Sequence, residues 1–147
     1  MTLENLLRIG RIKEHPADVA EIQKMLAAAR RSLKDARVQE ISLELRFDAA
    51  YNAIMQAALV ALMANGYRPD TNQPGHHMTV LQLLPKTLGL PGGRLAVLDT
   101  LRRKRNLANY IGEDIDEGSV KQCVKEAERL QEEVSAWLAA SHCELIK

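Results

Sequence analysis

The chain has 147 residues, of which 46% are hydrophobic and 27% charged, values typical of one soluble globular domain spanning residues 1–147 and not of a disordered chain. The formal net charge is only +1, which excludes a globally basic surface, so any contact with nucleic acid has to come from local clustering of cations. Aromatic residues make up only 3% of the chain, which argues against the base-stacking platforms of single-strand-binding proteins.

The N-terminal segment predicts a short first helix over Leu3–Arg11 that ends near Gly10. It lacks the cationic start and apolar core of an export signal. The most apolar run of the chain, Ala57–Ala64, is too short to span a bilayer. We therefore expect a cytoplasmic protein without a membrane partner.

A second helix is predicted after Pro16, which stands where a helix start tolerates proline. Apolar residues then recur at three- and four-residue steps from Val19 to Ala36, the pattern of an amphipathic helix. We expect this helix to end near Val38.

A third helix, capped by Ser42 and ending at Asn65, is the most apolar segment and is expected at the centre of the fold. One polar stripe with a spacing of four residues crosses it, formed by Asp48, Asn52 and Gln56. Two interpretations of the stripe stay open: it faces water, or it faces a neighbouring polar helix.

The composition of Tyr67–Gly75 predicts a loop. Three more helices are expected after it, over about His76–Leu84, over Arg94–Ile111 and from about Gly118 to Leu138. Pro85 should end or kink the first of them, and Gly112 should stop the second. No segment has a convincing strand pattern, so the expected fold is an all-α antiparallel bundle of five to six helices.

The fifth helix contains the run RRKRNLANYIG, Arg102 to Gly112. At about 100° per residue, its apolar face is centred on Val97, Leu101 and Ala108, with Leu98, Leu107 and Ile111 on the flanks. The polar residues occupy an adjoining arc, in the order Arg105, Asn109, Arg102, Asn106, Tyr110 and Arg103. Lys104 falls outside this arc, toward the apolar side, and has to extend its stem outward.

Arg105 stands at the border of the apolar face, where partial desolvation favours an acidic partner. Asp48 is the obvious partner, and we expect Asp48 and Asn52 together to position Arg105. The alternative is a solvated cationic face near a helix C-terminus, where cations complement the helix dipole.

Three patches, taken in order, resemble the HEPN domains (higher eukaryotes and prokaryotes nucleotide-binding), small helical bundles often found in toxin–antitoxin and defence systems. They are RFDAAYNAIMQAALVALMANGYRP in the third helix and its exit, GHH at Gly75–His77, and LRRKRNLANY in the fifth helix. The resemblance covers about residues 17–137 and rests on the order and spacing of the patches.

The resemblance implies a homodimer in which the two arginine-bearing helices face one another across a cleft. In active members, an arginine, usually followed by asparagine or another polar residue, and a histidine five positions later cut RNA without a metal. Arg105 and Asn106 match the first two positions, and the arginine would stabilise the charge that develops at phosphorus. Tyr110 stands where the histidine would serve as general acid and base at the ribose 2′-hydroxyl.

Tyrosine in the histidine position predicts that RNA cleavage is weak or lost. The pKa of a phenol is ordinarily about 10, whereas that of an imidazole is about 6.5, so tyrosine is a poor general base at neutral pH. No histidine lies on the fifth helix. His76 or His77 could reach the site only through folding, and at most one would, because adjacent helical residues point about 100° apart. The alternative is that both are polar residues at a helix start.

Other chemistry is not indicated. Cys123 and Cys143 have no CxxC spacing and are expected to be free thiols in a reducing compartment. The histidine pair has no carboxylate or cysteine at ligand spacing, and the chain has no glycine-rich phosphate loop. We therefore expect neither a metal nor a cofactor.

Together with the homodimer that the resemblance implies, the basic face of the fifth helix favours a HEPN-like protein that binds RNA, or a partner associated with nucleic acid, through that face. Arg102, Arg103, Asn109, His76 and His77 are the expected binding residues, and Arg105, Asn106 and Tyr110 the expected catalytic group. One alternative is a protein-interaction module, antitoxin-like or a scaffold subunit, that binds a cognate protein and no nucleic acid. Another is a face that mediates self-association only.

Overall fold

The structure, a computed structural model, describes residues 2–73 and 75–145. As predicted, it is a helical bundle: 73% of it is helix, in seven α-helices of which five are substantial, with one two-stranded sheet, within those residues. The elements in chain order are α1 (Leu3–Arg8), β1 (Ile12–Glu14), α2 (Val19–Ala36), α3 (Leu43–Ala64), β2 (Tyr67–Pro69), α4 (His76–Gln82), α5 (Leu84–Thr87), α6 (Gly92–Ile111), α7 (Glu117–Ser141) and a final 3-10 turn (Cys143–Leu145).

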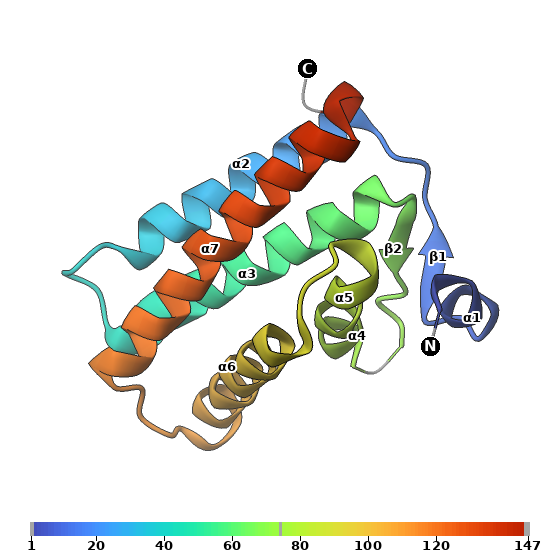
Figure 1. Ribbon diagram of the computed structural model, residues 1–147. Coiled ribbons are helices and arrows are strands. Elements are labelled where there is room, and N and C mark those ends of the chain that lie inside the picture. Colours follow the sequence, from blue (N-terminus) through green and yellow to red (C-terminus); the bar gives the residue numbers. More distant parts are fainter. Residues whose placement is uncertain (1, 74, 146–147) are drawn as a thin grey trace.

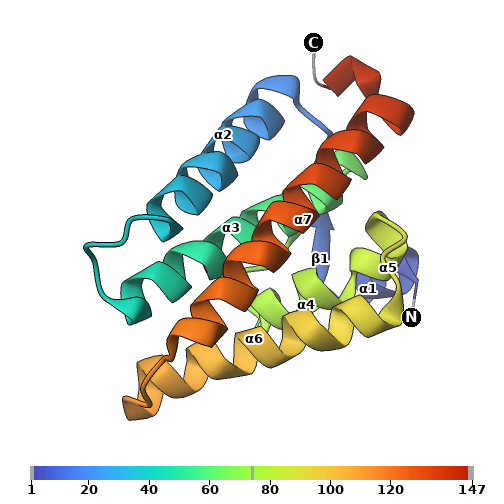
Figure 2. The same cartoon turned by 60° about the vertical axis from the view of Figure 1, so that its left-hand side comes forward.

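Helix α3 is the centre of the bundle. Helices α2 and α7 pack along one side of it, and α4, α5 and α6 cover the other side (Figures 1 and 2). Consecutive long helices run in opposite directions, α2 against α3 and α6 against α7. Because α6 carries the chain back, α7 returns beside α3 in the same direction as α3 (Figure 1).

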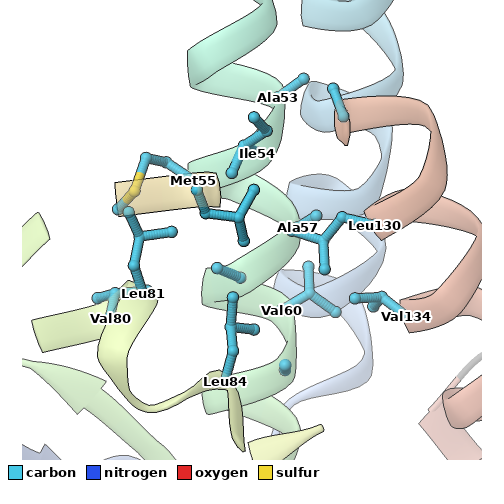
Figure 3. Close-up of a cluster of buried hydrophobic side chains, with 14 of the residues drawn as sticks. Ala53, Ile54, Met55, Ala57, Val60, Val80, Leu81, Leu84, Leu130 and Val134 are labelled. Carbon is cyan, nitrogen blue, oxygen red and sulfur yellow. The ribbon is translucent and has the colours of Figure 1, made fainter. Parts of the chain in front are cut away.

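The core is built from the small and branched apolar residues of α3. Figure 3 shows Ala57 and Val60 of α3 beside Leu130 and Val134 of α7, all fully buried. Alanines along α3 let the neighbouring helices approach closely, and burial of this apolar surface is the main stabilising term.

Local capping signals explain where the long helices begin and end. The hydroxyl of Ser42 accepts the backbone N–H of Leu45 at 3.1 Å, which confirms the predicted N-cap of α3. Gly112 ends α6 with φ of +68°, a left-handed conformation that favours glycine. Helix α2 begins later than Pro16 suggested, because the carboxylate of Asp18 caps it at Val19.

The prediction that the chain has no strand is wrong. Residues Ile12–Glu14 pair antiparallel with Tyr67–Pro69, Ile12 opposite Pro69, so the expected loop after α3 begins as a strand. Three residues are too few to show an alternating pattern, and proline is tolerated because this two-stranded sheet has only edges. Pro74, also part of the expected loop, lies outside the described residues.

Pro85 breaks the fourth predicted helix into two. Helix α4 ends at Gln82, and the short helix α5 begins at Leu84 with the proline in its first turn. This offset lets the α4–α5 segment turn against α3 and α6.

Helix α3 has the length and mean hydropathy, 1.3, that crossing a membrane would require. However, 72% of its most apolar 18-residue window is buried inside the molecule, as expected of the central helix of a bundle.

Candidate nucleic-acid interface

The side of α6 that faces the molecule carries arginine at both ends. Arg94, Leu98 and Leu101 are buried, and Arg105 and Ala108 continue the same stripe at three- and four-residue steps. The side chain of Arg105 is 26% exposed, so it lies at the edge of the core, as the helical periodicity predicted.

Two residues of α3, one turn apart, hold the guanidinium of Arg105. Its Nε lies 3.9 Å from Oδ1 of Asp48, and its Cζ lies 5.2 Å from the ring centroid of Tyr51. A cation over an aromatic face contributes about 0.5–1 kcal/mol, and more where water is excluded. The expected pairing of Asp48 with Arg105 is therefore present at ion-pair distance.

The hydrogen bonds of this arginine are incomplete. Nε is buried, and no acceptor within the described residues lies at hydrogen-bond distance from it. Burial raises the pKa of Asp48, and the nearby Arg105 lowers it to a smaller extent. Nε itself is inaccessible, but the side chain is 26% exposed, so the accessible part of a guanidinium that is already held in place can offer N–H donors to an added anion.

Tyr51 forms the buried wall beside Arg105. Its side chain is fully buried, its hydroxyl finds no hydrogen-bond partner in the described part of the chain, and burial raises its pKa to about 12. The phenol therefore stays neutral at any physiological pH.

One of the two adjacent histidines joins this group. The ring of His77, from the first turn of α4, lies 6.3 Å from the ring of Tyr51, and His76 packs edge-on against His77 at 4.6 Å. Burial, then the neighbouring His76 and Arg105, lower the pKa of His77. The imidazole of His77 is therefore neutral at pH 7.

The remaining cations of the basic run have partners. Nε of Arg102 lies 2.9 Å from Oδ1 of Asp99, and Nη2 of Arg103 lies 3.0 Å from its Oδ2. Nζ of Lys104 donates to the hydroxyl of Ser119 at 2.6 Å, on the next helix. Of the two arginines, only Arg103 is well exposed, at 72%, while the Arg102–Asp99 pair is partly buried. An exposed ion pair contributes little stability, about 0–1 kcal/mol, so a phosphate can bind Arg103 at low cost.

The other predicted site residues are more open to solvent. Asn106 is half-buried, and Asn109 and Tyr110 are exposed, Tyr110 at 81%. Asn52 is exposed, and no hydrogen bond joins it to Arg105 within the described residues. Tyr110 and Asn52 therefore stand apart from the Arg105–Asp48–Tyr51–His77 group, which we call the arginine cluster.

The polar stripe of α3 fits neither single interpretation. Asp48 faces α6, Asn52 faces solvent, and a hydrogen bond of 2.7 Å joins the amide of Gln56 to the hydroxyl of Ser32 on α2. A spacing of four drifts by about 40° per step around a helix, so one stripe meets different neighbours along its length.

Part of the predicted apolar face of α6 is not covered. Leu107 and Ile111 were expected on the flanks of the apolar face, and they are 45% and 70% exposed. Helical periodicity gives the face of a residue and not the extent of the neighbours that cover it. The last turn of α6 therefore presents apolar side chains to solvent.

Sequence reasoning missed two residues of the site. Asp99 precedes Arg102 and Arg103 by three and four positions, a spacing that was available to predict both ion pairs. Tyr51 follows Asp48 by three positions, and its periodicity indicates only the apolar face of α3. No sequence signal linked it to His77.

Among the described residues, no metal-ligand cluster is present, and one of the two free cysteines is buried. No three histidine, cysteine or acidic side chains converge there as metal ligands. Burial raises the pKa of Cys123 to about 12, so this thiol is protonated and unreactive, while Cys143 is exposed.

In comparisons with known proteins, the sequence matches no family model and no curated protein. The functional argument therefore rests on the residues and their geometry.

Proposed function

We propose that this protein is a HEPN-like homodimer of the cytoplasm that binds RNA through α6, with Arg105 as the principal phosphate contact. Arg102, Arg103, Asn106 and Asn109 extend this surface along the helix. The histidine pair of α4 lies at its inner edge.

The proposal rests mainly on the contacts that the guanidinium of Arg105 makes and lacks. Its guanidinium is fixed over Tyr51 and beside Asp48, yet a buried nitrogen lacks an acceptor within the described residues. A fixed, partly desolvated guanidinium binds a phosphate oxygen with less loss of side-chain entropy than a mobile surface cation. A purely solvated cationic face would not keep an arginine against the core.

The uncovered end of α6 supports the homodimer. Leu107, Tyr110 and Ile111 expose apolar surface in the last turn, next to the polar face that bears Arg105. Exposed apolar surface of this kind favours association, and two copies meeting here would bring two Arg105 side chains to one groove.

Weak cleavage or none follows from the same geometry. Tyr110 is exposed and lies outside the arginine cluster, so it has no base to activate it among the described residues. His77 has a neutral imidazole, but it stands beside Tyr51 and is not paired with Arg105. We expect binding without rapid hydrolysis.

The test compares the affinity of a mixed-sequence single-stranded RNA for the wild type, Arg105→Ala and Arg31→Ala. Arg31 is an exposed cation on α2, which the figures place on the far side of α3 from α6. We expect Arg105→Ala to weaken binding by about tenfold, which corresponds to about 1.4 kcal/mol, and Arg31→Ala to leave it unchanged. Equal effects of the two substitutions would contradict the proposal.

RNA cleavage is measured in the same samples, from the length of the RNA after incubation with the protein. Rapid degradation by the wild type that is lost in Arg105→Ala would show that the site is an efficient ribonuclease, against our expectation.

A protein-interaction module remains the second candidate, because Asp99 partly neutralises Arg102 and Arg103. That function predicts no measurable RNA affinity at low salt and a complex with an acidic protein that tolerates moderate salt.

A further inference from the structure

A cavity of about 350 Å³ opens where α2, α3, α4 and β2 meet. Its apolar lining includes three methionines, Met25 from α2 and Met55 and Met63 from α3. Figure 3 shows Met55 beside Val80 and Leu81 of α4, against which the inner part of this wall packs. We call this cavity the methionine pocket.

Methionine makes the pocket suited to a flat aromatic ligand. Thioether sulfurs contact aromatic ring edges favourably, by about 0.3–1.5 kcal/mol each, and the unbranched side chains adjust to the outline of the ring. A pocket for an aliphatic chain needs no such sulfurs. Three of them in the lining of one pocket therefore favour a planar ring.

Polar groups at the rim fit a ring that carries hydrogen-bonding atoms. Nε2 of His15 and Oε2 of Glu21 lie 2.7 Å apart there, and Arg68 of β2 is exposed beside them. A mostly apolar cavity with a few convergent polar groups is typical of small-ligand sites. Donors and acceptors at the edge of an apolar slot are what a heteroaromatic base requires.

The methionine pocket and the arginine cluster share one residue. His77 lines the pocket, and its ring lies 6.3 Å from the ring of Tyr51, over which Arg105 is held. Along α3, Asp48, Asn52 and Met55 follow one another at steps of four and three, on one face.

We propose that the methionine pocket binds one unstacked nucleobase while Arg105 contacts a phosphate of the same ligand. The ligand class is a nucleotide, supplied either by the RNA strand or as a free mononucleotide. With RNA as the source, this inference rests on the proposed function and adds base selection to it, since a pocket that surrounds the base edge discriminates bases and a phosphate contact does not.

The test uses protein labelled with ¹³C at the methionine methyl groups and follows their NMR signals during titration with AMP, GMP, CMP and UMP. We expect the signals of Met25, Met55 and Met63 to shift and that of Met78 to stay in place. Met78 is a matched internal control, because it lies on α4 but lines a separate cavity next to α1.

Two substitutions at the pocket sharpen the result. Met25 is only half-buried, so Met25→Trp fills the slot from its rim, and Met25→Leu keeps the volume. We expect the tryptophan variant to bind mononucleotides about tenfold more weakly and the leucine variant to bind them within about twofold of the wild type. Unfolding by urea confirms that both variants are folded.

The proposal that the pocket binds a nucleobase is contradicted if the signals of the three methionines do not shift at up to about 10 mM nucleotide. It is also contradicted if the Met78 signal shifts as much as theirs. RNA that binds through Arg105 without moving these signals would also overturn it and leave the proposed function intact. A third outcome is that mononucleotides shift the three methionine signals while Arg105→Ala leaves the RNA affinity unchanged. That result would support the pocket as a site for free nucleotide and contradict the proposed function.

Discussion

Arg105 combines two requirements that rarely coincide, since it is held against the core and still lacks a complete set of acceptors within the described residues. Lysine would not serve the same purpose, because only a planar guanidinium can stack on Tyr51 while offering further N–H donors to a phosphate. Partial burial raises the pKa of Asp48, and the nearby Arg105 lowers it to a smaller extent, so the pair is partly screened by solvent.

His77 makes the stability of the fold depend on pH. Its pKa is lowered in the folded state, so below about pH 6.5, where a free imidazole gains its proton, the unfolded chain binds more protons than the native one. Stability is therefore full above about pH 6.5 and falls as the pH drops toward the native pKa. The groups that face the ring are His76 on its own helix, Tyr51 on α3 and Arg105 on α6.

We predict that His77→Gln flattens this loss of stability, measured by urea unfolding at pH 7.5 and pH 5. The control is His142→Gln, because that imidazole packs on Trp137 and lies next to Glu144, away from the arginine cluster. If the free energy of unfolding changes with pH equally in the wild type and in His77→Gln, then His77 is not the source of the pH dependence.

At the residue scale, the sequence was enough to pair Arg105 with Asp48, because each stands out as a charge on or beside an apolar helical face. It was not enough to find Tyr51 and His77. Their contact joins α3 to α4, and the angle between those helices depends on side-chain packing that no local pattern records.

The position of α6 depends on a buried ion pair at its other end. The side chain of Arg94 is 9% exposed, and its Nε lies 3.3 Å from Oε2 of Glu126 on α7, while Nη1 lies 2.7 Å from Oε1 of Glu133. Removing one member of a buried pair leaves the other charge desolvated, at a cost of about 3–5 kcal/mol.

We predict that Arg94→Met destabilises the fold by about 3–5 kcal/mol, measured by urea unfolding. The double variant Arg94→Met with Glu126→Met should lose much less, because both desolvated charges are gone and the volume is kept. Glu133 is a third exposed and remains solvated in both variants. Equal losses in the single and double variants would show that packing, and not charge, holds α6 on α7.

The long helices and their caps were predictable because capping residues and apolar periodicity are local signals, as Ser42 and Gly112 illustrate. The pairing of Ile12–Glu14 with Tyr67–Pro69 was not, because it joins short segments more than 50 residues apart. This small sheet ties the N-terminal segment to the exit of α3.

At the scale of the whole molecule, the uncovered last turn of α6 is the expected contact between two copies. We predict that the wild type is a dimer in sedimentation experiments and that Ile111→Glu dissociates it, because a buried unpaired carboxylate is costly. The control is Ile9→Glu at the end of α1, also more than half exposed but remote from α6. A monomeric wild type, or dissociation by both variants, would contradict this interface.

The net charge is only +1, and Arg102–Arg105 is the longest run of consecutive cations in the sequence, so we expect this run to be the main phosphate-binding surface. The salt dependence of RNA affinity measures how many phosphates that surface binds. For single strands, the slope of log affinity against log salt has a magnitude of about 0.7 for each phosphate that the protein neutralises.

The most direct test is therefore this slope for wild type and Arg105→Ala. If two copies of Arg105 line one groove and each contacts a phosphate, the substitution lowers the magnitude of the slope by about 1.4. A slope that does not change when Arg105 is removed would show that this guanidinium contacts no phosphate and would contradict the account.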